Sequence, residues 1–340
     1  MPDPIIISRY QRSDRAEVME FLPTAFPEPR AKRLIAQWDW KYDSFPFNSE
    51  PDPYILLMRD ANKIIGMLGA LSLRAFIRGE EYLISSGCDA IVHTSYRGRG
   101  LFARLIECNA RDRRLGMGWG NSASNHIWAD STTGNFRVIP MIAPSFFHGY
   151  GLGRPPADAR AAGKIEVIQI EKFDSRFDAL WQSVRCDFPV AIIRDQRYLN
   201  WRYCERPDET YTRLCAVRGD ELLGYIVVRT AWKEQARGQR IRLGYLVDWT
   251  VKGRSFETLS LLVRHAFANI RRQGVRFVSA RTTTPTFRSM LHRLGFVSWY
   301  WGPREYAITQ VALQDEKLQV LNDMRQWFST MGDGDLEMSF

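Results

Sequence analysis

The stretch VHTSYRGRGLFARLI, residues 92–106, contains a glycine-rich turn between a predicted strand and a predicted amphipathic helix. At such a turn the first N–H groups of the helix have no backbone acceptor, and the helix dipole adds partial positive charge. Gly98 and Gly100 let an anion approach the backbone, and Arg97 and Arg99 add charged donors. We therefore predict an anion site here, suited to a pyrophosphate, in preference to a plain turn with solvated arginines.

Two other phosphate-binding motifs fit this stretch less well. The chain has no G-x-x-x-x-G-K-[ST] sequence, which argues against a P-loop. Gly98, Gly100 and Ala103 match the dinucleotide fingerprint G-x-G-x-x-A, but that fingerprint needs an acidic residue roughly 20 positions later. None lies between Asp112 and Asp130. A nicotinamide dinucleotide is therefore not the expected ligand.

The chain also contains an internal repeat. The pattern W-[KR]-Y-x-x-x-P occurs at residues 40–46 and again at residues 201–207, which is 161 positions later. Further landmarks keep offsets of 158 or 159 positions, namely Gly66 and Gly224, Asp89 and Asp248, and Gly116 and Gly274. We therefore expect two copies of one domain, residues 1–160 and 161–312, followed by a tail, residues 313–340.

Each copy is predicted to contain the same elements in the same order. A polar helical segment bearing a tryptophan precedes a hairpin of two apolar strands, a strand carrying the aspartate, an amphipathic helix and a last apolar strand. A strand, a helix and a strand in this order predict a right-handed parallel crossover. The expected fold class is therefore α/β, with a mixed sheet flanked by helices in each of two tandem copies. The tail is predicted to form one amphipathic helix that packs on the second copy through Leu318, Leu321, Met324 and Phe328.

The turn in the first copy resembles a known family signature. Residues 97–101 fit the first five positions of [RQ]-x-x-G-x-[GA], the acyl-CoA signature of the GNAT superfamily of N-acyltransferases, and Phe102 stands where that family usually has Gly or Ala. The pairs Gly149-Tyr150 and Gly295-Phe296 are similar to the Gly-aromatic pair that closes the family's domain. The whole chain thus resembles a tandem GNAT protein.

This resemblance implies that the first copy binds acetyl-CoA, or another acyl-CoA, through the backbone amides of the turn. The second copy has VKGRSF at residues 251–256 in place of the glycine-rich turn, so it is expected to serve as a scaffold or as a platform for the acceptor. The residues that the resemblance places at the cofactor are Ile91, Val92, Arg97, Gly98, Arg99, Gly100, Leu101 and Phe102.

The resemblance also implies direct transfer of the acyl group to an amine, for which the site needs a base. A carboxylate on the central strand is a common base in the family, which makes Asp89 the first candidate. Asp248 at the equivalent place in the second copy favours the alternative, a structural hydrogen-bonding role for both aspartates. His93 is the second candidate base.

The acid that protonates the leaving thiolate is often, in this family, a tyrosine four residues before the closing glycine. That position holds Ser145 in the first copy and Leu291 in the second. Tyr150, Tyr96 and His148 are the substitutes that the sequence offers, and water is a further one.

Two aromatic features receive different interpretations. The Trp–Tyr pairs at residues 40–42 and 201–203 are expected to anchor the core, because both copies have them. The polar, aromatic-bearing segment at residues 121–128 is confined to the first copy and is a candidate acceptor-binding loop, with an ordinary surface excursion as the alternative.

The composition bounds the partners and the compartment. The net charge is +9, and the 47 basic residues comprise 39 Arg and 8 Lys; a solvated surface is the first explanation of this excess, and an anionic ligand or partner is the second. The sequence contains no run of five or more consecutive basic residues, so a nucleic-acid partner is not expected. The five cysteines contain no CxxC pair, so neither a metal site nor a disulfide framework is predicted. With no membrane span or signal peptide pattern, the cytoplasm is the expected location.

Together these features predict an N-acyltransferase that moves an acyl group, acetyl first among the candidates, from acyl-CoA to a primary amine. A small-molecule acceptor, anionic if the arginine excess serves it, is expected rather than a protein. Two alternatives stay open: a non-catalytic protein that senses CoA or binds a partner on the same fold, and a tRNA-dependent aminoacyl transferase. The sequence identifies neither the acceptor nor the oligomeric state.

Overall fold

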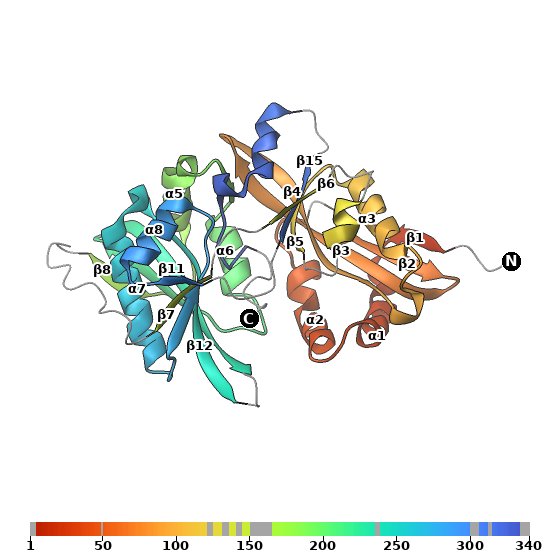
Figure 1. Cartoon of the computed structure of the whole chain (residues 1–340), viewed down its shortest axis with the longest axis horizontal. Helices are drawn as coiled ribbons and strands as arrows, with labels where there is room; N and C mark the ends of the chain where they lie inside the picture. Colours follow the sequence, from red (N-terminus) through yellow and green to blue (C-terminus); the bar gives the residue numbers. More distant parts are fainter. Residues whose placement is uncertain are drawn as a thin grey trace. The chain divides into compact units, whose positions relative to one another are not determined.

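The computed structural model describes residues 5–48, 50–120, 125–130, 136–140, 145–149, 165–234, 239–299, 306–311 and 315–333. The chain divides into two units (Figure 1). No helix in the described part of the chain is long and apolar enough to cross a membrane. Unit 1 consists of Met1–Met141, Glu205–Asp208 and Pro303–Asp323, and unit 2 consists of Ile142–Cys204, Glu209–Gly302 and Met324–Phe340.

Unit 1 is built on a mixed sheet. Its strands, in spatial order, are β1 (Ile6–Arg9), β2 (Ile55–Asp60), β3 (Lys63–Ile77), β4 (Glu80–Val92), β5 (Leu115–Gly120), β15 (Tyr306–Val311) and β6 (Phe136–Pro140). β4 and β5 are parallel, and the other neighbouring pairs are antiparallel. An antiparallel hairpin that leads into a parallel crossover is the arrangement that the sequence predicts.

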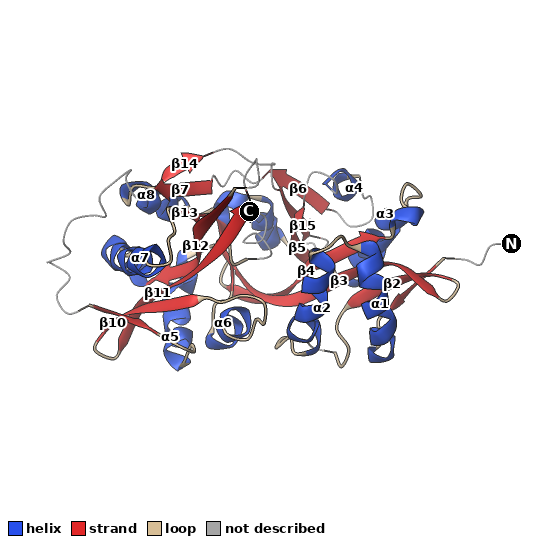
Figure 2. Ribbon diagram, turned by 90° about the horizontal axis from the view of Figure 1, so that it is seen from below, coloured by secondary structure: helices blue, strands red, loops and turns tan. Residues whose placement is uncertain are grey.

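Helices cover both faces of this sheet (Figure 2). The first two helices pack on one face, around Trp38 and Leu57, and the third packs on the other face, around Leu105 and Leu56. Neighbouring residues of a strand point to opposite faces, so a strand buried on both faces is apolar throughout. The helices are α1 (Arg15–Ala25), α2 (Arg30–Trp38), α3 (Leu101–Asp112) and α4 (Asn125–Ala129), with a π-helical turn at Asp39–Asp43 and 3-10 helices at Arg12–Asp14, Thr94–Tyr96 and Glu316–Asn322.

Unit 2 repeats this plan with a seven-stranded sheet. Its strands, in spatial order, are β14 (Val297–Trp299), β7 (Ser145–Gly149), β13 (Phe277–Ala280), β12 (Arg240–Val251), β11 (Glu221–Glu234), β10 (Thr212–Arg218) and β8 (Glu166–Gln169). β12 and β13 are parallel, as β4 and β5 are in unit 1. The predicted α/β fold class, with a mixed sheet in each copy, is confirmed.

The helices of unit 2 also lie on both sides of its sheet, with the first two on one side and the last two on the other (Figure 2). Two short strands, β9 (Val190–Ile192) and β16 (Trp327–Phe328), pair with each other in parallel. The helices are α5 (Ser175–Val184), α6 (Gln196–Tyr203), α7 (Phe256–Arg271) and α8 (Pro285–Arg293), and 3-10 helices occur at Arg185–Asp187, Lys252–Arg254 and Met324–Gln326.

The repeated glycines Gly66 and Gly224 have a packing reason. Each lies on the second strand of a hairpin, β3 or β11, beside the next strand. A Cβ atom on Gly66 would lie 3.1 Å from the carbonyl oxygen of Ile91, and one on Gly224 would lie 2.7 Å from that of Thr250. Glycine suits both copies at this point, because a side chain would crowd the neighbouring strand in unit 1 and would collide with it in unit 2.

One strand of each sheet comes from the other half of the chain. β7 precedes residue 150 in sequence, yet it lies between β13 and β14 in unit 2. β15 follows residue 305, yet it lies between β5 and β6 in unit 1. The predicted boundaries at residues 160 and 312 fall outside the described residues, and this reciprocal exchange means that neither unit is one continuous segment.

The tail differs from the single amphipathic helix predicted for it. Its first described part is the 3-10 helix Glu316–Asn322, which belongs to unit 1, and its second part enters unit 2 and contains β16. The four apolar residues expected to face a core are buried, but three of them recur every three residues, which suits a 3-10 helix. The strand pairing of Trp327 and Phe328 with β9 then ends any helix.

The strand exchange predicts which sheet is loosened when a residue of β15 is replaced by proline. Thr309 pairs with Met117 of β5 and Arg137 of β6, so Thr309→Pro removes a hydrogen bond from the middle of the unit 1 sheet. An unmade buried hydrogen bond costs about 1–3 kcal/mol, so amide exchange in Leu115–Gly120 should accelerate roughly tenfold or more. Hydrogen exchange with mass spectrometry measures this directly.

The matched control is Phe147→Pro in β7, whose backbone pairs with Ser279 and Val297. It should accelerate exchange in Phe277–Ala280 of unit 2 and leave β5 unchanged. If Thr309→Pro instead loosened β13 and spared β5, the exchange of strands between the two halves would be wrong.

Candidate functional site

Asp89 lies at a bulge near the end of β4. The register of β3 against β4 shifts between Met67 and Gly69, because β4 carries an extra residue there. Asp89 itself has a φ of +50°, in the left-handed region that residues other than glycine seldom adopt. A bulge re-aims the side chains beside it, and here it directs the carboxylate to the residues that follow α2.

The carboxylate of Asp89 belongs to a buried ion pair. Lys41 Nζ lies 2.8 Å from its Oδ2 atom, and the Tyr42 hydroxyl donates a hydrogen bond to the same oxygen at 2.8 Å. The side chains of Lys41 and Asp89 are 6% and 3% exposed. Burial, followed by the negative charge of Asp89, raises the pKa of Tyr42 well above its ordinary value. The Tyr42 hydroxyl therefore stays protonated and remains a donor to Asp89.

Asp248 occupies the same kind of environment in unit 2. It lies beside a bulge, where the β11–β12 register shifts between Val227 and Val228. Its carboxylate is 1% exposed and 3.1 Å from Nε of Arg194, and it accepts a hydrogen bond from the Tyr225 hydroxyl at 3.0 Å. In both units the repeated aspartate is thus buried at a bulge beside a cation and a tyrosine.

These contacts bear on the predicted role of Asp89 as a base. The Asp89 carboxylate is buried and already engaged by the Lys41 ammonium group and the Tyr42 hydroxyl, so it ties the segment after α2 to β4. The contacts favour the structural alternative given in the sequence analysis, and catalysis by Asp89 stays a prediction. The motif residues Trp40, Tyr42 and Trp201 are buried, which confirms that the Trp–Tyr pairs anchor the cores.

The glycine-rich turn has the backbone geometry that an anion site requires. Gly98 and Gly100 have φ angles of +76° and +70°, and Gly100 is the N-cap of α3. No heavy atom lies within 4 Å of the place where a Cβ atom would stand on either glycine. Two consecutive left-handed turns over open space therefore present the first amides of α3 to solvent.

The arginines of this turn keep their charge unpaired. Arg97 Nε donates to the carbonyl oxygen of Val92 at 3.1 Å, and Arg99 Nη2 donates to that of Ser95 at 3.3 Å. The Arg99 guanidinium also lies 5.2 Å from the centre of the Tyr96 ring. Among the described residues, neither guanidinium forms an ion pair with a carboxylate. Two positive charges thus stand beside the exposed amides of the helix.

The other predicted cofactor residues are apolar parts of the neighbouring core. Val92 and Leu101 are buried in the cluster beneath α3, and Phe102 packs against that cluster. Ile91 packs against the cluster on the opposite face of the sheet. Their side chains fix the end of β4 and the start of α3, so the polar groups of the site come from the turn between them.

β4 and β5 separate before the chain reaches this turn. Ser85 pairs with Gly116 and Ser86 with Met117, whereas β4 continues as far as Val92. Parallel strands that separate leave backbone N–H and C=O groups without ladder partners along their facing edges. A cavity of about 40 Å³ lies where the strands separate, and Gly87 and Gly118 are among its lining residues.

Most of the cavity lining is apolar, with a few polar atoms among it. Met117, Trp128, Phe136 and Ile308 line the cavity. Three further lining residues carry buried polar atoms that have no hydrogen-bond partner in the described part of the chain, namely Ser85 Oγ, Asn109 Oδ1 and Trp119 Nε1. Buried polar atoms without partners are unusual in a folded protein, and at a cavity they indicate a place where a ligand group can bind.

The sequence analysis did not find this cavity. Its lining comes from β4, α3, β5, α4, β6 and β15, and no local pattern brings those elements together. One signal was available: glycine occupies every second position of β5, at residues 116, 118 and 120. Glycines spaced in this way along a strand mark a face where something approaches the backbone closely.

The remaining acid–base candidates lie around the turn. His93 Nδ1 accepts a hydrogen bond from the backbone N–H of Ser95 at 3.3 Å, so the neutral ring carries its proton on Nε2. The Tyr96 hydroxyl donates to Asp60 at 2.8 Å, and this hydrogen bond is the main reason that its pKa is raised. Tyr150 lies outside the described residues. The roles of His93, Tyr96 and Tyr150 stay predictions.

The described residues contain no group of three or more His, Cys, Asp or Glu side chains that could hold a metal ion. All five cysteines are free thiols.

Comparison with known proteins bears on this geometry. Residues 7–120 match the family model described as the acetyltransferase (GNAT) domain. Unit 1 therefore contains a region similar to a GNAT domain. The match covers β1 to β5, including the bulge, the glycine-rich turn and α3, and so it contains every described residue predicted to bind the cofactor. No curated protein matched the sequence.

Solved structures extend the likeness to the whole chain. A probable N-acyltransferase from Enterococcus faecalis V583 matches with a TM-score of 0.63 and 11% identity over 92% of this chain and 74% of that one. A GCN5-related N-acetyltransferase from Anabaena variabilis ATCC 29413 matches with a TM-score of 0.61 and 11% identity, over 89% and 72% of the two chains. Saccharomyces cerevisiae N-myristoyltransferase with bound myristoyl-CoA matches with a TM-score of 0.54 and 12% identity, over 91% and 84%.

At these identities the likeness establishes the fold and no more. Because each match spans both units, the predicted tandem GNAT fold is confirmed. The GNAT-like region of unit 1 carries the glycine-rich turn, and the second GNAT-like unit carries the sequence VKGRSF in its place.

The paired aspartates give a test of the structural role. Asp89→Asn keeps the side-chain shape but removes the carboxylate charge beside Lys41, and Asp248→Asn removes one of the two carboxylate charges beside Arg194. Breaking a buried ion pair typically costs about 3–5 kcal/mol, so both variants should unfold several degrees below the wild type. Thermal unfolding followed by circular dichroism measures the two shifts side by side.

The catalytic alternative predicts a different pattern. If Asp89 were the base, Asp89→Asn would lower turnover on the order of 10²-fold or more with acyl-CoA binding unchanged, and the loss would shrink as the pH rises and the acceptor amine loses its proton. A stable Asp89→Asn protein with that pH profile would contradict the structural role. Asp248→Asn is the control, since it lies in the unit that has no glycine-rich turn.

Proposed function

We propose that the protein is an acyl-CoA-dependent N-acyltransferase in which unit 1 binds the acyl-CoA. The observation that carries the proposal is the glycine-rich turn at the start of α3, with two left-handed glycines over open space and two arginines that pair with no carboxylate of the described chain. The pyrophosphate of CoA carries negative charge, and amides and guanidinium groups in this arrangement are its natural partners. The family match of unit 1 supports the same assignment.

The separated strands suit the rest of the CoA molecule. The pantetheine arm is a linear chain with two amides, and such a chain can pair with the backbone edges that β4 and β5 leave open beyond Ser86 and Met117. Gly87 and Gly118 carry no side chain that would fill this space. The same residues that keep β4 and β5 apart would therefore hold the arm.

The cavity between the strands is the proposed place of the acyl group. Its volume of about 40 Å³ suits a short acyl group such as acetyl, and its lining is mostly apolar. Ser85 Oγ and Asn109 Oδ1 offer polar contacts there to the thioester end of the molecule. Acetyl-CoA is thus the proposed donor. A comparison of turnover with acyl-CoA donors of different chain length tests this part of the proposal.

Transfer to an amine needs the ammonium form to lose its proton before attack on the thioester carbon, and it needs a proton for the departing thiolate. Of the described candidates, His93 would accept a proton at Nδ1 in exchange for its 3.3 Å hydrogen bond from the N–H of Ser95, whereas Asp89 is held by Lys41 and Tyr42. We assign the first proton transfer to His93, directly or through water, with Asp89 as the alternative base. Tyr150 keeps its predicted role as a candidate acid for the departing thiolate. The excess of arginine supports a small anionic amine as the acceptor. The cytoplasm stays the expected location of the protein.

A non-catalytic CoA-binding protein is the second candidate function. One observation favours it: the carboxylate at the family's common base position is buried in an ion pair. A protein of this kind would bind acetyl-CoA as the enzyme does but would not consume it in the presence of any amine. Release of free CoA thiol, measured with a thiol reagent across a panel of amines, separates the two functions.

The binding step is tested by thermal unfolding with two nucleotides. Acetyl-CoA at 100 times its dissociation constant should stabilise the folded protein by about 2.7 kcal/mol, because it binds the folded state alone, and NAD should have no effect. An equal shift with both nucleotides, or a shift with NAD alone, would refute the acyltransferase assignment.

A pair of glycine variants places the binding in unit 1. Gly100→Val and Gly253→Val both introduce a branched residue at a positive φ, +70° and +57°, and neither new Cβ meets another atom within 4 Å. Both variants therefore cost a similar backbone strain, about 1–2 kcal/mol. Only Gly100→Val should abolish acetyl-CoA binding, measured by titration calorimetry. Loss of acetyl-CoA binding in both variants, or in neither, would show that the assignment of the site to unit 1 is wrong.

A further inference from the structure

The two units deal differently with their separating strands. In unit 2, β12 and β13 pair from Leu243 with Phe277 to Leu246 with Ala280 and then separate, as β4 and β5 do in unit 1. In unit 1 the strands separate around a cavity. In unit 2 the corresponding space holds residues 327–333 of the same chain, which we name the C-terminal segment.

Backbone hydrogen bonds join the C-terminal segment to both walls of this space. On the β12 side, the N–H of Gly332 donates to the carbonyl oxygen of Val247 at 2.9 Å. On the β13 side, the N–H of Thr283 donates to the carbonyl oxygen of Ser329 at 3.2 Å, and the N–H of Ser329 donates to Thr283 Oγ1 at 3.1 Å. The segment thus satisfies the backbone groups that the separation exposes, as an added strand does.

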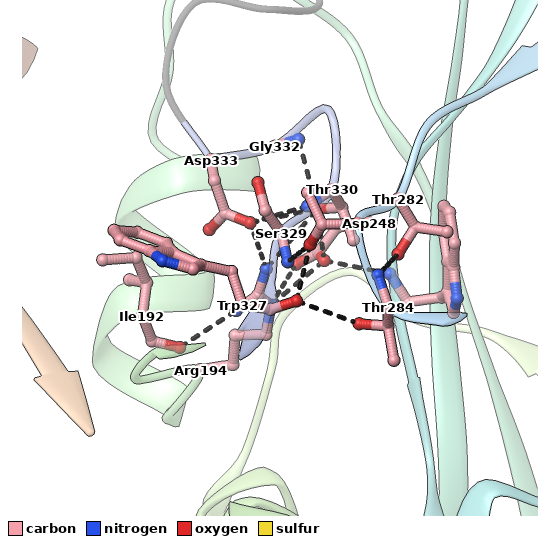
Figure 3. Close-up of polar contacts among 12 residues, drawn as sticks. Ile192, Arg194, Asp248, Thr282, Thr284, Trp327, Ser329, Thr330, Gly332 and Asp333 are labelled. Carbon is pink, nitrogen blue, oxygen red and sulfur yellow. Dashed lines mark hydrogen bonds and ion pairs between the residues drawn. The ribbon is translucent and has the colours of Figure 1, made fainter. Parts of the chain in front are cut away.

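Side chains fix the segment in place (Figure 3). The guanidinium of Arg194 lies between two carboxylates, with Nε 3.1 Å from Asp248 and Nη2 2.5 Å from Asp333 of the segment. The Thr330 hydroxyl donates to Asp248 at 2.9 Å. All three charged side chains are at most 2% exposed, and Met331 is fully buried. The segment is therefore part of the core of unit 2.

The turn before α7 is also closed to an anion. Lys252 forms an ion pair with Glu221 at 2.5 Å. Arg254 lies 3.9 Å from the carboxylate of Asp187 and donates to the carbonyl oxygen of the same residue. The basic residues of this turn are thus neutralised by acids of unit 2, in contrast to Arg97 and Arg99 in unit 1.

We propose that the C-terminal segment takes, in unit 2, the place that the pantetheine arm of acyl-CoA takes in unit 1. The chain then binds one acyl-CoA, and the groove of the second copy is closed by the chain itself. This inference rests on the proposed function of unit 1. It also gives the second copy a definite structure. Its groove is filled by residues 327–333 of the same chain, and the core of unit 2 depends on that segment.

Gly332 offers a way to displace the segment. A Cβ atom on Gly332 would lie 2.0 Å from the Tyr203 hydroxyl oxygen, closer than any two such atoms can come. Gly332→Ala should therefore push the segment out of the groove. That hydroxyl is buried and has no hydrogen-bond partner among the described residues, so Tyr203→Phe removes it without breaking a hydrogen bond. The double variant Gly332→Ala/Tyr203→Phe restores room for the segment and is the matched control.

The experiment counts acetyl-CoA sites on the full chain by titration calorimetry, and hydrogen exchange of residues 327–333 reports whether the segment is released. The wild type should bind one acetyl-CoA. Gly332→Ala should bind two, the second roughly tenfold or more weakly because the opened groove has no glycine-rich turn for the pyrophosphate. The double variant should return to one site. If residues 327–333 remain protected from hydrogen exchange in Gly332→Ala, the larger side chain of Gly332→Leu is used to displace them.

Each other outcome has a defined meaning. Two sites in the wild type, or a single site in a variant whose segment exchanges freely, would overturn this inference and leave the proposed function standing. No binding by the wild type would overturn the proposed function, and the inference with it. If no displaced variant folds, exchange in the wild type decides: acetyl-CoA should protect β4 and β5 and leave β12 and β13 unchanged, and protection of β12 and β13 would overturn the inference.

Discussion

Parallel strands that diverge must find other partners for the backbone groups along their facing edges, and this constraint shapes both halves of the chain. In unit 1 the divergence begins after Ser86 and Met117 and encloses a cavity lined by glycines. In unit 2 it begins after Leu246 and Ala280 and is filled by the C-terminal segment. The same strand geometry therefore accompanies a cavity in one copy and a filled core in the other.

A buried carboxylate stands at the point of divergence in each unit, and it dictates which cations lie nearby. Asp89 is matched by Lys41 of the W-K-Y motif. Asp248 is matched by Arg194 instead, and Arg202 of the second motif donates to the carbonyl oxygen of Gly332 in the C-terminal segment. The aromatic residues of the motif anchor the core in both copies. Its basic residue contacts the aspartate in unit 1 and the C-terminal segment in unit 2.

The sequence predicts the elements within each copy, because they depend on local patterns. The repeat, the hairpin glycines and the left-handed glycines of the turn all have their expected places, since close backbone approach and a positive φ leave few other residues possible. The exchange of β7 and β15 depends on pairing between strands far apart in the chain, which no local pattern encodes. The ion pair of Asp89 with Lys41 has the same origin: a bulge, visible only in the paired sheet, turns the side chain away from its expected direction.

The exchange of strands explains why the second copy persists although its own groove is closed. β15 lies between β5 and the edge strand β6 in the unit 1 sheet, and its residues Ile308 and Gln310 line the unit 1 cavity. The amide of Gln310 also donates to the carbonyl oxygen of Ala110 in α3 at 3.0 Å, so it ties the helix that begins at the glycine-rich turn to the sheet. A first copy without the second half of the chain would lack a wall of its cavity and the strand that joins β5 to β6. The sheet and the cavity of the first copy therefore depend on a strand from the second half of the chain.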